Sequence, residues 1–161
     1  MTSNGGKWII PSAMSSAISY SSNGMTVSGL SSGQSMYLST SYNTPVIAEF
    51  DYVNGSASAN TVASPQLLLD GSVHNENSIS IRPNGNTLNI IDNSGTATSY
   101  PVTSVVGHYK IEFTSSTSYK IYKDDTLVAT VSNVSISSTN MMLLSASNRS
   151  FTIKNVKIKP L

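Results

Sequence analysis

The stretch His108–Val131 reads HYKIEFTSSTSYKIYKDDTLVATV and decides the fold. At its start Tyr109, Ile111 and Phe113 alternate with charged residues, as in a β-strand with one buried and one wet face. Asp124–Asp125 predicts a tight turn, because Asp tolerates left-handed backbone and bonds its own chain locally. The stretch therefore predicts a three-stranded antiparallel meander. Its expected inward residues are Tyr109, Ile111, Phe113, Tyr119, Ile121 and Leu127.

Length and composition predict one domain with a core. The 161 residues fit a single domain, 1–161, with residues 1–6 as a flexible start. The apolar fraction of 39% is enough for a core, whereas only 11% of residues are charged, against about a quarter in typical soluble domains. Hydroxyls and amides must therefore cover most of the surface. This composition favours an extracellular or virion-associated location.

Charge and cysteine content exclude several classes of function. The formal net charge is +1 and the basic residues are scattered, so the basic stripe that nucleic-acid binding requires is missing. There is no cysteine for disulfides or thiolate metal sites. No apolar run approaches the ~20 residues of a membrane-spanning helix. No signal peptide is recognisable, so export would use another route, or the chain is one domain of a longer protein.

The rest of the chain predicts further short strands separated by turns. The final strand changes parity, because Phe151 and Ile153 alternate in one phase while Val156 and Ile158 alternate in the other. Both pairs can face one core only if a residue bulges out near Lys154–Asn155. No long stretch has a helical period. The pattern therefore predicts an all-β antiparallel sandwich. The expected strands outside the meander are Lys7–Ile10, Ala17–Tyr20, Met25–Leu30, Ser35–Ser39, Pro45–Val53, Gln66–Leu69, Ser78–Arg82, Thr87–Ile91, Thr98–Val102, Met141–Ala146 and Phe151–Ile158.

The order of these strands resembles a known family. The strand-like segments occur in the order VIAEFDY, LLLDG, SISIRPNGNTLNI, the meander and the closing FTIKNVKIKPL. They resemble the concanavalin-like jelly roll of laminin-G, legume-lectin and bacterial carbohydrate-binding domains. In that family a Y-x-I-x-F…Y-x-I-Y-x-D-x-x-L-V meander precedes a last strand ending I-x-N-V-x-I. The Ser/Asn-rich style also resembles modules of phage tail fibres and baseplates.

Glu49 and Asp51 are the strongest catalytic candidates. Jelly-roll glycosidases of the laminarinase type carry E-x-D followed by a second Glu, with the first Glu as nucleophile and the last as acid/base. A retaining pair must lie about 5–5.5 Å apart. The position that should complete the set reads Val53 or Asn54, so the general acid is missing. We expect no catalytic residue and interpret Glu49 and Asp51 as a solvated strand face.

The loop Asp70–Asn77 is the densest polar segment. Its oxygens make calcium a candidate ligand, and His74 is a candidate for sugar or metal contact. The spacing matches no EF-hand or zinc pattern, so a solvated loop is the simpler interpretation and any metal ligand is left unassigned. Asp124–Asp125 is read as a turn, with calcium at the sandwich rim as the alternative.

Sugar binding needs flat apolar surfaces and planar polar groups that bond hydroxyls in pairs. Arg82 and Tyr122 have outward parity, and they would share a concave face if their strands were neighbours. Tyr42 is expected in a loop. Each candidate has the alternative of being an ordinary surface residue. The candidate carbohydrate-binding residues are Arg82, Tyr122, His74, Asn75 and Tyr42.

The leading hypothesis is a non-catalytic carbohydrate-binding module. Its partner would be a glycan or cell-wall polysaccharide, bound in host-surface adhesion by a phage tail, baseplate or bacterial surface protein. One alternative is a structural virion or fibre domain that contacts other virion or fibre subunits. Another is a jelly-roll glycoside hydrolase or lyase with its acid residue elsewhere. Nucleophilic catalysis is excluded, because there is no G-x-S-x-G and neither histidine has a triad context.

Overall fold

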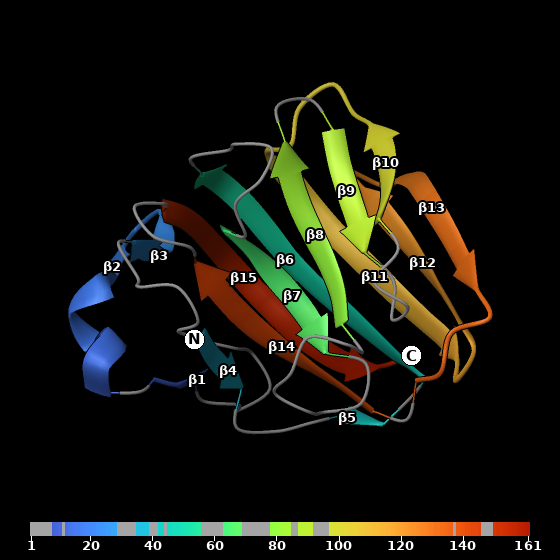
Figure 1. Cartoon of the computed structure of the whole chain (residues 1–161), viewed down its shortest axis with the longest axis horizontal. Helices are drawn as coiled ribbons and strands as arrows, with labels where there is room; N and C mark the ends of the chain where they lie inside the picture. The colour runs from blue at the N-terminus through green and yellow to red at the C-terminus, as the bar shows by residue number, and fades with distance from the viewer. Residues whose placement is uncertain are drawn as a thin grey trace.

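The described residues form two antiparallel sheets, which Figure 1 shows. This computed structural model describes residues 8–10, 12–28, 35–38, 42–43, 45–55, 63–68, 78–84, 87–91, 97–136, 138–145 and 150–161. The eight-stranded sheet has the spatial order β1 (Trp8–Ile9), β4 (Ser35–Leu38), β14 (Ser138–Ser145), β7 (Ala63–Leu68), β8 (Ser78–Asn84), β9 (Thr87–Ile91), β10 (Ala97–Pro101), with β5 (Tyr42–Asn43) paired to β14. The seven-stranded sheet has the order β13 (Thr126–Ser132), β12 (Ser118–Lys123), β11 (Gly107–Ser115), β6 (Val46–Gly55), β15 (Ser150–Pro160), β3 (Gly24–Ser28), β2 (Ile18–Ser21). A short 3-10 helix, η1 (Ser12–Ala17), precedes β2.

The predicted meander is confirmed as β11, β12 and β13. Ile111 pairs with Ile121, and Ile121 pairs with Ala129, so these inward residues form one row across three strands. The predicted turn between β12 and β13 is also confirmed. Asp124 and Asp125 have φ angles of 48° and 62°, which is the left-handed pair that a two-residue hairpin turn requires.

Leu127 corrects one detail of the prediction. It was expected to face the core, but it is 51% exposed. The register shifts between Ile121, which pairs with Ala129, and Tyr122, which pairs with Leu127. Val128 is therefore an extra residue on β13, and such a β-bulge reverses the parity of the residues before it.

The core lies between the sheets and is rich in aromatic rings. Phe50 stacks on Tyr109 with ring centroids 5.3 Å apart, and Phe113 packs at a tilt on Tyr119 at 5.7 Å. All four residues are fully buried. They come from β6, β11 and β12, so these rings determine which face of the seven-stranded sheet is turned toward the core.

The predicted bulge in the last strand is also confirmed. The register of β15 against β6 shifts between Lys154 and Lys157, and Asn155 has a φ angle of 53°. Ile153, Val156 and Ile158 are consequently all buried, while the lysines of the strand are exposed. Asn155 thus allows both halves of the strand to face one core.

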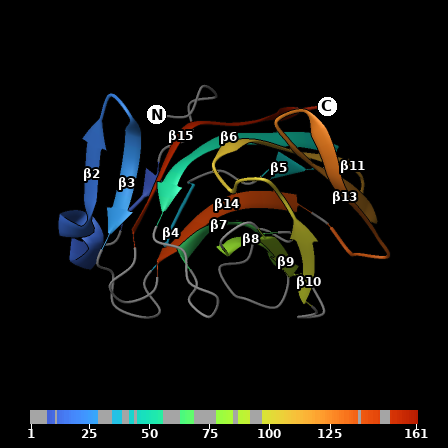
Figure 2. The ribbon, with the colours of Figure 1, turned by 90° about the horizontal axis from the view of Figure 1, so that it is seen from above.

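The two sheets bow in the same direction. Figure 2 shows β6 and β14 curved toward the side of the seven-stranded sheet, so the outer face of that sheet is convex. In the described part of the chain, no helix has the length and apolar character needed to cross a membrane.

Candidate functional site

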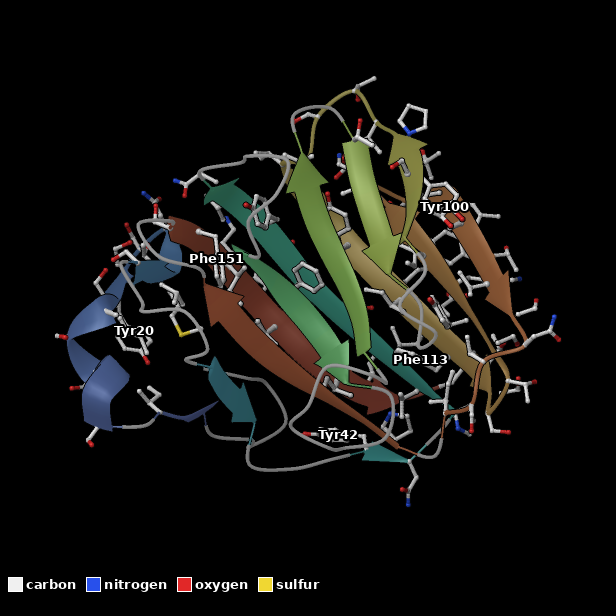
Figure 3. The ribbon with its side chains drawn as sticks, in the orientation of Figure 1. Tyr20, Tyr42, Tyr100, Phe113 and Phe151 are labelled. Atoms are coloured by element: carbon white, nitrogen blue, oxygen red, sulfur yellow. The ribbon has the colours of Figure 1, made fainter. Side chains whose placement is uncertain are left out.

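A pocket of about 520 Å³ opens between the edge strands of the two sheets. We call it the rim pocket. One wall comes from β10 and the residues after it, and the other comes from the β12–β13 hairpin. Figure 3 shows Tyr100 between β10 and β13. The lining includes Tyr100, Thr103, Lys123, Asp124, Thr126 and Leu127.

Lys123 supplies a buried charge to the rim pocket. It follows Tyr119 and Ile121 in the inward phase of β12, and its side chain is only 7% exposed. A buried ammonium group requires a partner, and the Asp124 carboxylate at the turn forms an ion pair with Lys123 Nζ. The pocket therefore contains one cation and one anion in contact.

Asp124 is held in place by the neighbouring strand. The His108 backbone N–H donates a hydrogen bond to Asp124 Oδ1 at 2.8 Å, and the Asp124 N–H donates to the His108 carbonyl at 2.9 Å. Hydrogen bonding from Lys123, followed by that from the His108 backbone, lowers the pKa of Asp124 below its ordinary value. The carboxylate is thus ionised and fixed at neutral pH.

Gly107 makes room for this ion pair. A Cβ at position 107 would lie 2.5 Å from Asp124 Oδ1 and 2.7 Å from Lys123 Nζ, and the φ angle of Gly107 is +152°. Only glycine adopts that backbone readily. The position therefore requires a glycine both for its conformation and for the close approach of the two charged side chains.

A buried tyrosine supports the segment that leads into β11. The Tyr109 hydroxyl donates a 2.6 Å hydrogen bond to the Val105 carbonyl. Burial raises the pKa of Tyr109 well above its ordinary value and that of Tyr52 to about 12. Both phenols therefore remain neutral hydrogen-bond donors at neutral pH.

Arg82 and Tyr122 do not share a face. Arg82 lies on β8 in the eight-stranded sheet, whereas Tyr122 lies on β12 in the other sheet. Their strands are not neighbours, because β8 pairs with β7 and β9, whereas β12 pairs with β11 and β13. The condition for a shared face is therefore not met, and their individual roles in sugar binding remain predictions. His74, Asn75 and the rest of the loop Asp70–Asn77 lie outside the described residues.

Tyr122 takes part in a charged cluster on the convex face. Lys110 Nζ lies 4.3 Å from the centre of the Tyr122 ring and 3.0 Å from Glu112 Oε1. Hydrogen bonding from Lys110, and to a smaller extent from the Tyr122 hydroxyl, lowers the pKa of Glu112. Lys110 therefore covers part of the ring surface that a sugar would need for stacking.

Tyr42 was expected in a loop, but it lies in the two-residue strand β5 and packs partly buried against the core. Pairing of β5 with Ser138 and Thr139 of β14 draws it into the sheet. Its role in sugar binding stays a prediction.

Glu49 and Asp51 point outward from β6, as the alternation predicts, and both are engaged with neighbours. Glu49 Oε1 lies 3.3 Å from Lys159 Nζ. Asp51 Oδ1 lies 2.7 Å from His108 Nδ1, and Asp51 Oδ2 accepts a 2.6 Å hydrogen bond from Asn155 Nδ2. Both carboxylates thus have structural partners on the convex face. Among the described residues, no group of three or more His, Cys, Asp or Glu side chains is arranged to hold a metal ion.

The rim pocket contains residues that the sequence pattern did not single out as functional. Tyr100 and Thr103 come from segments with no distinctive motif, and Leu127 was expected in the core. Asp124 had been noted as an alternative calcium ligand at the sandwich rim, and Lys123 carried a second signal, since it is a charged residue in the inward phase of an otherwise apolar strand face. Such a residue indicates either a buried ion pair or a site.

Comparisons with known proteins identify the fold. No protein-family model matches the sequence, and no curated protein matches it significantly. Among solved structures, the carbohydrate-binding module CBM66 from Bacillus subtilis is similar, with a TM-score of 0.57 and 14% identity over 96% of this chain and 91% of that one. A putative glycosyl hydrolase from Parabacteroides distasonis has a TM-score of 0.62 and 10% identity over 91% of each chain. β-Agarase A from Zobellia galactanivorans has a TM-score of 0.57 and 11% identity over 90% of this chain and 76% of that one. The chain is an all-β sandwich with the concanavalin-like jelly-roll fold.

Proposed function

We propose that this jelly roll is a non-catalytic carbohydrate-binding module and that the rim pocket is its sugar site. The observation that carries the proposal is the composition of the pocket. Tyr100 and Leu127 offer apolar surface, while Thr103, Thr126 and Asp124 offer oxygen atoms for hydroxyl groups. A few placed polar groups in a mainly apolar hollow are typical of a ligand site. The similarity to a carbohydrate-binding module supports the same function.

The charges of the rim pocket favour a neutral sugar. Lys123 and Asp124 form an ion pair, so their charges offset each other. A carboxylate or sulfate on the ligand would gain from Lys123 but would be repelled by Asp124. Hydroxyl groups, in contrast, donate to the carboxylate and accept from the ammonium group.

The absence of catalysis is part of the proposal. Glu49 and Asp51 are each held by a neighbouring polar side chain, and the sequence has no acid at positions 53 or 54. These contacts suit an ordered strand face better than a proton donor and nucleophile. Adhesion to host-surface glycans, on a phage tail, baseplate or bacterial surface protein, is the finer form of the proposal and rests on the low charge and the Ser/Asn-rich sequence.

Isothermal titration with soluble agarose, xylan and β-glucan tests the proposal. We expect one of these neutral polysaccharides to bind, and Tyr100→Ala to weaken binding roughly tenfold through loss of the aromatic surface. Leu161→Ala is the control, because it removes an exposed apolar side chain outside the rim pocket. Absence of binding by the wild-type protein to any polysaccharide in a wider glycan array would overturn the proposal. Polysaccharide cleavage that Glu49→Gln abolishes would instead support the hydrolase alternative.

A further inference from the structure

The ion pair in the wall of the rim pocket keeps hydrogen-bonding capacity for a ligand. An ammonium group has three N–H donors, and a carboxylate has about four acceptor positions. Asp124 Oδ2 accepts from Lys123 Nζ, and Asp124 Oδ1 accepts from the His108 N–H. Within the described part of the chain, no further hydrogen bond or ion pair engages the Lys123 ammonium or the Asp124 carboxylate. Donors on one group and acceptor positions on the other therefore remain available side by side.

Neighbouring residues hold the pair in position. Lys123 lies opposite Tyr109 of β11 on one side and opposite Thr126 of β13 on the other. Tyr109 is fully buried, and the Lys123 side chain itself is only 7% exposed. The His108 N–H fixes the Asp124 carboxylate at 2.8 Å. Groups that are ordered before binding lose little side-chain freedom when a ligand arrives, so this pair is suited to recognition.

The contact between the two charged groups restricts the ligand that fits them. A hydroxyl group is both a donor and an acceptor, so one hydroxyl can accept from Lys123 Nζ while a second donates to Asp124. Because the ammonium group and the carboxylate are in contact, the two hydroxyls must also be close together. Hydroxyl groups on neighbouring carbon atoms of one sugar ring meet this condition, whereas hydroxyls separated by a third carbon lie farther apart.

The position of Lys123 also bears on the calcium that the sequence left as an alternative at this rim. Calcium requires six to eight oxygen ligands, and Asp124 supplies carboxylate oxygens here. The Lys123 ammonium already contacts this carboxylate. A second cation on Asp124 would be repelled by the ammonium group at short range. The chain thus provides the positive charge of the pocket from its own side chain.

We infer that Lys123 and Asp124 together recognise a vicinal diol, meaning two hydroxyl groups on neighbouring carbons of one sugar ring, without a metal ion. The inference rests on the proposed function for the location of the site. It adds the chemical group that is recognised. Xylan keeps such a pair on each unsubstituted residue, because the second and third hydroxyl groups are free. In laminarin the linkage uses the third hydroxyl, so only the terminal residue of a chain retains adjacent hydroxyls at its second, third and fourth carbons.

Titration calorimetry of the whole protein with xylan and laminarin tests the inference on the wild-type chain. We expect xylan to bind at least about tenfold more tightly than laminarin at equal mass, because a lost hydrogen bond to a charged group has about this effect. Periodate cleaves the carbon–carbon bond between adjacent hydroxyl groups. Treatment of the bound polysaccharide with periodate should therefore abolish binding, while EDTA in the buffer should leave the affinity unchanged.

Lys123→Met tests the role of the ammonium group directly. Methionine fills a similar volume without N–H donors, so we expect binding to weaken about tenfold or more. Lys120→Met is the matched control, because it removes the same group from the outer face of the same strand. We expect it to change the affinity by less than about twofold. Thermal melts check that both variants are folded.

The outcomes separate this inference from the proposed function. Binding that survives periodate treatment, equal affinity for laminarin and xylan, wild-type affinity in a folded Lys123→Met variant, or loss of binding in EDTA would each overturn the inference and leave a carbohydrate-binding module standing. Failure of the wild-type protein to bind any polysaccharide would overturn both. If Lys123→Met does not fold, the comparison of native and periodate-treated polysaccharide on the wild-type protein still decides.

Discussion

His108 and Asp124 are joined by a reciprocal pair of hydrogen bonds that ties the β12–β13 turn to the start of β11. The His108 N–H donates to Asp124 Oδ1 at 2.8 Å, and the Asp124 N–H donates to the His108 carbonyl at 2.9 Å. The same carboxylate pairs with Lys123. One side chain thus closes the end of the meander and compensates the buried charge in the rim pocket. Under the proposed function, Asp124 would therefore contribute both to stability and to binding.

Asp124→Asn should destabilise the fold at neutral pH by about 1 kcal/mol, because Lys123 keeps its buried charge and loses its carboxylate partner. This figure allows for screening by water, since the Asp124 side chain is 55% exposed. The pKa of Asp124 is lowered from its ordinary value of 3.8, so the carboxylate's contribution is present above that pH and lost as the pH falls through the lowered value. Urea titrations at pH 7 and pH 2.5 measure the difference. Asp125→Asn is the control from the same turn, and equal losses in both variants would contradict the assignment.

Gly107→Ala should lower stability by about 2 kcal/mol. The added methyl group would approach Asp124 Oδ1 at 2.5 Å, and the backbone would keep a φ angle of +152°. Differential scanning calorimetry measures the loss as a drop in Tm. The adjacent Val106→Ala, at an exposed position, should change Tm only slightly. An unchanged Tm in Gly107→Ala would show that the turn relaxes around the methyl group.

Lys110→Gln should raise the pKa of Glu112. Hydrogen bonding from Lys110 is the main cause of the lowered value, and the charge of Lys120 contributes less. Carboxyl-detected NMR titration of Glu112 should therefore show a shift toward the ordinary value of 4.5. Lys120→Gln removes the same charge from the same face and should move the pKa less. A larger shift in Lys120→Gln would reverse the assignment of the two partners.

Ile121→Ala and Leu127→Ala should differ sharply in stability. Ile121 is fully buried in the core, whereas Leu127 is half exposed at the rim. Truncation of a buried Ile costs about 2–5 kcal/mol, while an exposed position usually changes stability by about 0.5 kcal/mol or less. Equilibrium unfolding in urea distinguishes the two. Similar losses would mean that Leu127 faces the core in solution.

The sequence predicted the meander well because the two-residue alternation of inward and outward side chains is a local signal. Each of Tyr109, Ile111 and Phe113 takes its face from its neighbours in the chain, and the turn at Asp124–Asp125 is recognisable from the types of those two residues. The bulge at Asn155 was predictable for the same reason, since the parity of the buried residues changes within one strand. The prediction that Leu127 is buried was wrong, because the bulge at Val128 produces no recognisable change of pattern in a strand whose alternation is weak.

The sites were hard to predict because they depend on register between distant strands. Asp51 meets His108 and Asn155 across sequence separations of 57 and 104 residues. The rim pocket requires β10 of one sheet to lie beside β13 of the other. No local sequence pattern specifies which distant residues become neighbours. A shift of one residue in the pairing of these strands would separate the groups. In the sequence, the rim pocket was marked by the inward Lys123 and by the Asp124–Asp125 turn.

The bulge at Val128 has a consequence for how the protein behaves when many copies are crowded together. β13 is the last strand of its sheet, and its sequence TLVATVS contains no charged residue or proline. A flat strand of that kind would be a template on which further chains could assemble into fibres. The extra residue interrupts the ladder and increases the local twist. Deletion of Val128 would restore a regular edge and promote aggregation, so this bulge protects solubility in a chain that has few charges to do so.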